Sequence, residues 1–304
     1  MDLDAVQINF SESSRHLMNV LLAFIMFGVS LDIKWRHFRD LWKSPKSALT
    51  GIFSQFVFLP LITLGLVYLL RPHPSMALGM FLLAAVPGGN ISNFMSHLAR
   101  GNTALSISLT AFSSLASIIM TPLNFAFWGS LYPETRTIIR EIHLDPIEVF
   151  EIISLLLIIP LFLGVLFSSR FPTLTERIKK PIKNLSIIIF LAFVVVAFQA
   201  NFSIFLKVIK YIALYVAIHH TFALLSGYGL ASLTRLPGAD RRTIAIETSI
   251  QNSGLALILV FNFFDGLGGM ALMAAWWSIW HISIGLFVST VWSKFPPRTR
   301  GIFE

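Results

Sequence analysis

Long apolar stretches recur from one end of this sequence to the other. Each is about twenty residues long, enough for a helix to cross the roughly 30 Å hydrocarbon core of a bilayer. Charged residues make up only 12% of the chain and hydrophobic residues 55%, whereas a soluble domain carries about 25% charged residues. The sequence therefore predicts an all-α polytopic membrane protein, with residues 1–304 forming a single transmembrane domain.

The apolar stretches can be placed as nine helices joined by short connections that carry Pro, Gly or charge. The predicted helices cover residues 16–32, 46–70, 75–99, 103–130, 147–169, 184–206, 208–233, 240–264 and 268–293. Residues 1–14 are polar and acidic, and no positively charged region precedes an apolar run. We therefore expect an extracytoplasmic tail here and no cleavable signal peptide.

Basic residues are distributed unevenly between the two sides of this layout. If the first connection is cytoplasmic, most of the 23 Lys and Arg lie in cytoplasmic segments. Such asymmetry predicts the N-terminus outside and the C-terminus in the cytoplasm of a cell membrane. The net charge of +8 is then a property of membrane topology, and we expect no nucleic-acid partner and no obligate protein partner.

Two predicted spans are interrupted by polar residues and helix breakers. Residues 87–93 (PGGNISN) lie within the third span and residues 247–254 (ETSIQNSG) within the eighth. Proline lacks a backbone donor and paired glycines weaken a helix, so we expect an unwound stretch near Pro87. Paired interruptions are typical of secondary transporters built from inverted repeats, whose broken helices meet near the bilayer midplane.

Only one of the fifteen acidic residues, Glu247, lies well inside a predicted span. An ionisable group at that depth is a candidate functional residue. No Lys or Arg lies in the middle of any span to balance it, so a bound cation or a proton is the expected counter-charge. A structural or proton-sharing carboxylate is the alternative.

Side chains with oxygen atoms occur in the same group of spans. They are Gln55, Ser92, Asn93, Ser106, Thr110 and Gln251. Gln251 follows Glu247 by four residues, as Thr110 follows Ser106, so each pair would share one helix face. Sodium, like other hard cations, prefers oxygen ligands. In the structural alternative, each hydroxyl or amide bonds a carbonyl of its own or a neighbouring helix.

Four strings of this sequence resemble the bile acid:sodium symporter family. They are PGGNISN at 87–93, LARGNTALSISLT at 98–110, ETSIQNSGLAL at 247–257 and WHIS at 280–283. Gln55-Phe56 followed by Pro60 is similar to an early glutamine motif of that family. The resemblance extends from about Met26 to Ser289, with matching spacing between the motifs.

The resemblance implies inverted repeats with two broken, crossing helices, and a core domain that moves against a panel domain. The core would comprise residues 46–130 and 208–293, and the panel residues 16–32 and 147–206. It also implies two sodium ions. The first sodium site would use Ser92, Asn93, Ser106, Thr110 and Glu247. The second would use Gln55, Gln251, Glu247 and the backbone carbonyls of Thr248 and Ile250.

The resemblance also implies an organic-anion substrate near the crossing of the broken helices. The implied contacts are Asn90, Ile91, Asn252 and His281. Here Asn90-Ile91 replaces the Thr-Ala usual in the family, and Ile282 follows His281 where Asn is frequent. A specificity for bile acids therefore does not carry over, and a small carboxylate such as pantoate stays equally open.

The leading hypothesis is sodium-driven uptake of an organic anion by alternating access. A proton-coupled carrier with Glu247 as the titrating group is the alternative within transport. A transport-inactive membrane receptor or sensor is a further alternative. We do not expect an enzyme, because the sequence has neither HExxH spacing nor a GxSxG elbow.

Overall fold

The computed structural model describes residues 12–31, 33–141, 156, 158–200 and 202–297, and these residues are almost entirely helical. The helices are α1 (Glu12–Ser30), α2 (Trp35–Lys43), α3 (Pro45–Phe53), the π-helix η1 (Ser54–Phe58), α4 (Leu59–Leu70), α5 (Pro74–Ala85), α6 (Ile91–Leu98), α7 (Thr103–Ser130), α8 (Pro133–Glu141), α10 (Ile159–Arg170), α11 (Pro172–Ala200), α12 (Phe202–Leu233), α13 (Gly238–Ser249), α14 (Ser253–Phe263) and α15 (Gly268–Ser293). The described ranges contain no β-strand, which confirms the predicted all-α class.

Among the residues that the structure describes, four helical stretches are long and apolar enough to cross a membrane. They are Pro45–Leu70, Thr103–Ser130, Ile209–Leu233 and Gly268–Ser293. Four shorter apolar helices lie among them: Asn19–Gly28, Pro74–Ala85, Ile159–Arg170 and Ser253–Phe263. The structure thus supports a multi-pass membrane protein, and the count of nine spans stays a prediction.

Some predicted boundaries were wrong or cannot be compared. Helix α1 begins at Glu12, four residues before the predicted start, because the polar residues at its beginning are also helical. The short polar helices α2 and α8 were missed, since neither has an apolar run. Much of the predicted fifth span, and the tail as far as residue 11, lie outside the described residues.

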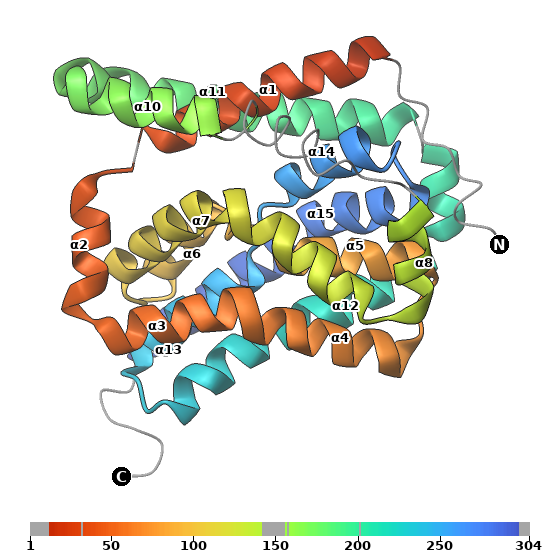
Figure 1. Ribbon diagram of the computed structural model, residues 1–304. Coiled ribbons are helices and arrows are strands. Elements are labelled where there is room, and N and C mark those ends of the chain that lie inside the picture. The colour runs from red at the N-terminus through yellow and green to blue at the C-terminus, as the bar shows by residue number, and fades with distance from the viewer. Residues whose placement is uncertain (1–11, 32, 142–155, 157, 201, 298–304) are drawn as a thin grey trace.

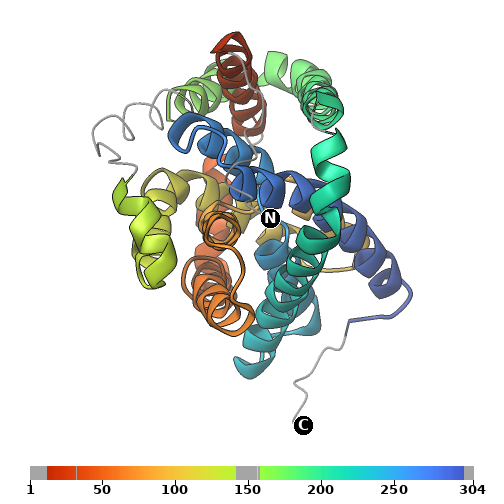
Figure 2. The ribbon, with the colours of Figure 1, turned by 90° about the vertical axis from the view of Figure 1, so that its right-hand side faces the viewer.

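Helices α1, α10 and α11 pack against one another and form a layer on one side of the molecule (Figure 1, top; Figure 2). This layer meets the remaining helices through α14, which lies beside α1. A reciprocal amide pair joins them: Asn19 Nδ2 donates to Asn262 Oδ1 at 3.1 Å and Asn262 Nδ2 donates to Asn19 Oδ1 at 2.8 Å.

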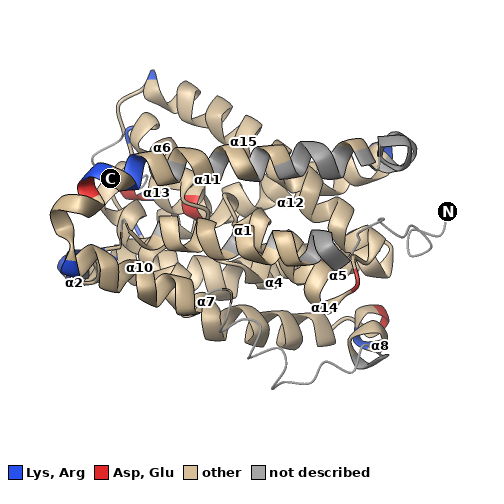
Figure 3. Cartoon of the chain, turned by 90° about the horizontal axis from the view of Figure 1, so that it is seen from above, with Lys and Arg blue, Asp and Glu red and all other residues tan. Residues whose placement is uncertain are grey.

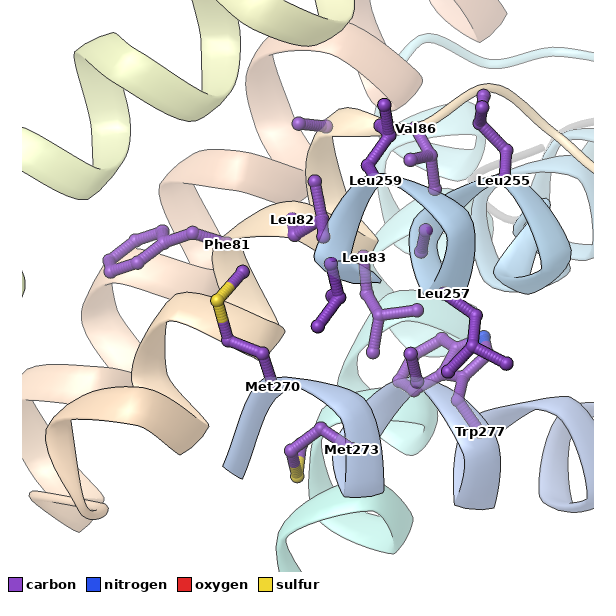
Figure 4. Packing of buried hydrophobic residues seen from close by; sticks show 14 of the residues in the cluster. Phe81, Leu82, Leu83, Val86, Leu255, Leu257, Leu259, Met270, Met273 and Trp277 are labelled. Carbon is purple, nitrogen blue, oxygen red and sulfur yellow. The ribbon is translucent and has the colours of Figure 1, made fainter. Parts of the chain in front are cut away.

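The hydrophobic core lies where α5, α14 and α15 meet (Figure 4). Helix α5 is apolar around its whole circumference, as expected of a helix surrounded by other helices. Gly79 allows α15 to approach closely, because a Cβ atom at this position would lie 2.9 Å from Met273 Cβ. Trp277 of α15 is fully buried in the same core.

The two interrupted spans are each broken into two helices, as predicted. Helix α5 ends at Ala85 and α6 begins at Ile91, while α13 ends at Ser249 and α14 begins at Ser253. The two breaks meet as a short antiparallel bridge: Gly89 N donates to Ile250 O, and Asn252 N donates to Pro87 O, both at 2.8 Å. Each break therefore satisfies backbone groups of the other, which a membrane interior requires.

Lys and Arg gather at the end of the molecule that carries α2 and the start of α13 (Figure 3). At this end the guanidinium of Arg242 donates to the carbonyl oxygens of Ala99, Trp292 and Phe295 at 2.8, 3.0 and 3.0 Å. These carbonyls end α6 and α15, where a helix dipole favours a cation. Arg242, near the start of α13, thus joins this helix to the C-terminal ends of α6 and α15 at the basic end of the molecule.

Candidate functional site

The Glu247 carboxylate is buried close to the helix crossing, with only 4% of the residue exposed. It accepts hydrogen bonds from Ser92 Oγ at 2.6 Å and from Ser106 Oγ. Thr110 Oγ1 lies 3.1 Å from both carboxylate oxygens. The first turn of α6 supplies Ser92, and two successive turns of α7 supply the other two hydroxyls. These two helices thus enclose a carboxylate that α13 carries.

The backbone is shaped to admit this carboxylate. A Cβ atom at Gly88 would lie 2.9 Å from Glu247 Oε2. Asn93 completes the group, since Thr110 Oγ1 also lies 3.2 Å from Asn93 Oδ1. The structure therefore brings together all five residues predicted for the first sodium site.

Within the described ranges, no basic side chain balances Glu247. Among the ion pairs of the described residues, none involves this carboxylate. Burying an ionised carboxylate without a counter-charge is unfavourable by several kcal/mol, on the order given for buried ions. Each hydroxyl can donate its proton to the carboxylate and still offer a lone pair to a cation. This cluster can therefore bind a small hard cation.

The second predicted set is only partly assembled. Gln55 Nε2 donates to Gln251 Oε1 at 2.8 Å, and Gln251 Nε2 donates to Thr248 O at 2.7 Å. The Ile250 carbonyl accepts from Gly89 N. Within the described hydrogen bonds, Glu247 reaches neither glutamine. The two amides and the Thr248 carbonyl thus form their own group, separate from the carboxylate.

A π-helical turn places Gln55 at this position. Pro60 lacks the N–H that would normally bond the Phe56 carbonyl one turn back, and Asn124 Nδ2 bonds this carbonyl instead, at 2.9 Å. Gln55 Nε2 also reaches Val86 O at 3.2 Å, at the end of α5. Such π-turns often lie at functional sites.

Sequence reasoning missed the side chains that support the π-turn and the breaks. Asn124 supports the π-turn through Phe56 O, and Thr121 supports the first break, since its hydroxyl donates to Ala85 O at 2.9 Å. Ser54 and Thr248 share a hydrogen bond of 2.7 Å between η1 and α13. Polar residues within the apolar spans were the available signal, but nothing in their spacing indicated which carbonyls they would meet.

Three of the four predicted substrate residues lie at the crossing. Asn90 and Ile91 are partly buried at the start of α6. Asn252 is partly buried at the start of α14, where its Oδ1 accepts from Leu255 N at 3.1 Å. The N-termini of α6 and α14 therefore both lie at the crossing. A helix N-terminus favours a bound anion.

His281 lies in a different environment. It is buried on α15, with its ring centroid 6.5 Å from that of Trp277. His219 and His220 of α12 pack against the same indole at 4.9 and 5.4 Å. His281 Nδ1 has no hydrogen-bond partner among the described residues, so a water molecule or a ligand atom would satisfy it.

Comparison with known proteins identifies relatives over most of the chain. The model of the Sodium Bile acid symporter family matches residues 19–226. The "Uncharacterized sodium-dependent transporter YocS" of Bacillus subtilis (strain 168) is 29% identical over 277 residues, which are 91% of this chain and 83% of the relative. The "Probable sodium/metabolite cotransporter BASS1, chloroplastic" of Arabidopsis thaliana is 27% identical over 277 residues, 91% of this chain and 67% of the relative. The Homo sapiens "P3 protein" is 30% identical over 261 residues, 85% of this chain but only 53% of the relative.

Two broken helices that cross beside buried polar groups, in an all-helical membrane protein, are the arrangement of a secondary transporter. The family match covers more than half of the sequence. The chain therefore belongs to the Sodium Bile acid symporter family, a family of sodium-dependent transporters. The names of its Bacillus and Arabidopsis relatives favour a carrier over an enzyme.

Proposed function

We propose that this chain couples sodium entry to uptake of an organic anion across a cell membrane. The observation that carries the proposal is the Glu247 carboxylate, which is buried and bonded by the hydroxyls of Ser92, Ser106 and Thr110. In the part of the chain that the structure describes, no basic side chain pairs with it. A sodium ion supplies the missing positive charge and uses the same oxygens as ligands.

A second sodium ion would bind at the two glutamines. The Gln55 and Gln251 side chains and the Thr248 carbonyl already lie within hydrogen-bond distance of one another. To bind an ion, the amides would turn their oxygen atoms inward, and Glu247 and the Ile250 carbonyl would contribute the remaining ligands. Two ions would thus share one carboxylate.

The substrate would bind beside the ions. The anionic group of the substrate would contact the N-termini of α6 and α14, near Asn90, Ile91 and Asn252. A polar atom of the substrate farther from this group would reach His281. A bile acid-like molecule and a small carboxylate such as pantoate both fit this chemistry. Because ions and anion meet at one crossing, binding of either favours the conformation that binds the other.

Alternating access would move the helices around the crossing against the layer of α1, α10 and α11. This division follows the proposed core of residues 46–130 and 208–293 and panel of residues 16–32 and 147–206. The basic end (Figure 3) would face the cytoplasm. The N-terminus would then lie outside and the C-terminus inside, as the distribution of basic residues in the sequence predicts.

The proposal is tested by flux measurements in proteoliposomes with sodium and proton gradients imposed separately at fixed pH. Organic anions that stabilise the purified protein in sodium, but not in potassium, are the substrates to use. Uptake is expected to follow the sodium gradient. Uptake that ignores sodium and follows a proton gradient would instead identify a proton-coupled carrier in which Glu247 titrates.

Replacing Gln251 is expected to weaken sodium binding without abolishing transport. The Gln251→Ala variant loses one oxygen ligand, and a hydrogen bond or ligand contact to a charge contributes about 1.5–3 kcal/mol. The sodium concentration for half-maximal uptake should therefore rise about tenfold or more. Gln199→Ala, which changes an exposed glutamine of α11, is the matched control. Superimposable sodium curves for Gln251→Ala and the control would remove this residue from the site.

Replacing Asn252 is expected to affect the substrate more than the ions. The Asn252→Ser variant keeps a side-chain acceptor for the N-terminus of α14 but removes the amide donor that could bind an anion. Its half-saturating substrate concentration should rise about tenfold, with little change in the sodium curve. Asn102→Ser is the control, because Asn102 caps α7 through Leu105 N at the same 3.1 Å. Equal shifts in both curves would contradict this separation of roles.

A further inference from the structure

Helix α2 lies across the end of the molecule at which the basic residues gather. In Figure 1 it runs along one edge of the molecule, beside the ends of α3 and α13, and in Figure 3 it lies at the outer edge of that end. It also connects α1, which belongs to the layer with α10 and α11, to α3 among the remaining helices. A helix across the ends of membrane spans lies parallel to the bilayer, at the level of the lipid headgroups.

The two faces of α2 differ in chemistry. His37 and Leu41 are buried, and Phe38 packs against the hydrophobic core, so this face holds the helix onto the protein. The opposite face carries the exposed side chains of Arg36, Arg39, Trp42 and Lys43, followed by Lys46 at the start of α3. Trp42 is 82% exposed.

Neighbouring acids neutralise only part of this charge. Asp40 pairs with Lys43 at 2.6 Å. Glu176 of α11 pairs with Lys179 at 2.6 Å and with Lys34 at 3.0 Å, and these two ammonium groups lower the pKa of Glu176 to about 2. Both acids are therefore engaged elsewhere. Arg36, Arg39 and Lys46 have no ion-pair partner among the described residues.

An exposed tryptophan beside unpaired basic side chains matches the headgroup region of an anionic leaflet. Indole rings favour the boundary between headgroups and acyl chains, and each nearby Lys or Arg contributes about 1 kcal/mol of attraction to anionic lipid, a factor of about five in affinity. Arginine also binds a phosphate with two parallel hydrogen bonds.

We propose that the outer face of α2 is a binding site for anionic phospholipid, with Arg36, Arg39 and Lys46 holding the headgroup phosphate and Trp42 lying among the upper acyl chains. The site is independent of the sodium and substrate sites. It anchors the covalent connection between the α1 layer and the remaining helices to one leaflet.

The test measures quenching of Trp42 fluorescence by brominated lipids. The full-length chain is reconstituted in phosphatidylcholine vesicles that contain a small fraction of either brominated phosphatidylglycerol or brominated phosphatidylcholine. The contribution of Trp42 is the difference in tryptophan fluorescence between the wild-type chain and the Trp42→Phe variant. We expect phosphatidylglycerol to be favoured over phosphatidylcholine by about fivefold or more.

The charge contribution is isolated by two triple variants. In Arg36→Gln/Arg39→Gln/Lys46→Gln the preference should fall to about one. It should be unchanged in Arg71→Gln/Arg136→Gln/Lys210→Gln, which removes three exposed basic residues that belong to neither α2 nor α3: one at the C-terminal end of α4, one in α8 and one in α12. Replacing the two arginines of α2 by lysine, as in Arg36→Lys/Arg39→Lys, keeps the positive charge and should retain most of the preference for phosphatidylglycerol. Equal quenching by both lipids in the wild-type chain, or an equal loss in both triple variants, would overturn the proposal.

Discussion

The Glu247→Ala variant is expected to lose sodium-dependent uptake while still entering the membrane and folding. The carboxylate is the only negative charge in the buried oxygen cluster, and removing one partner of a buried charge pair costs about 3–5 kcal/mol of interaction. Sodium affinity should therefore fall at least about 100-fold. The measurement is uptake into proteoliposomes of an anion that stabilises the wild-type chain, at several sodium concentrations.

Glu134→Ala is the control for this experiment, because it removes an exposed carboxylate of α8 far from the crossing. Folding of both variants is checked by thermal unfolding. Sodium should raise the unfolding temperature of the wild-type chain and of Glu134→Ala but not that of Glu247→Ala. If Glu247→Ala transports with a normal sodium dependence, the assignment of the site is wrong.

The Gly88→Ala variant is expected to impair sodium binding although it removes no ligand. Its new methyl group would lie 2.9 Å from Glu247 Oε2, so the carboxylate or the bridge between the two breaks must shift. Overpacking of this kind costs about 1–3 kcal/mol, which corresponds to about a 5- to 150-fold loss of sodium affinity. Sodium-dependent thermal stabilisation of the purified protein measures the change.

Gly65→Ala is the matched control for Gly88→Ala. Gly65 lies within α4, and a Cβ atom there has no neighbour within 4 Å, so this variant should keep the wild-type sodium dependence. A Gly88→Ala protein with unchanged sodium affinity would indicate that the close approach of this glycine to the carboxylate has no role in ion binding.

Glu247 could be singled out from the sequence because deep acidic residues are rare in a membrane protein. Six oxygen-bearing residues were expected near it, and the family resemblance implied which four belong to the first set. Those four meet Glu247 or one another in the structure, whereas the two glutamines form a separate group. The breaks were predictable for a similar reason. Proline and paired glycines disrupt the helix locally, whatever the surrounding structure.

Features that depend on tertiary contacts were not predictable in this way. The π-turn at Gln55 was not predicted, and only the fold shows that Asn124 bonds the Phe56 carbonyl that Pro60 leaves without a donor. His219 and His220 lie beside Trp277 because of how α12 packs against α15, which no motif spacing specifies. Helix α2 was missed because its amphipathic nine residues look like a charged loop when only apolar runs are counted.

Equilibrium binding of radioactive sodium to the purified full-length chain tests the central claim most directly, with potassium or choline keeping the ionic strength constant. We expect saturable binding by the wild-type chain and by Glu134→Ala, and none by Glu247→Ala in the same concentration range. Saturable binding to Glu247→Ala with wild-type affinity would contradict a sodium site built on this carboxylate.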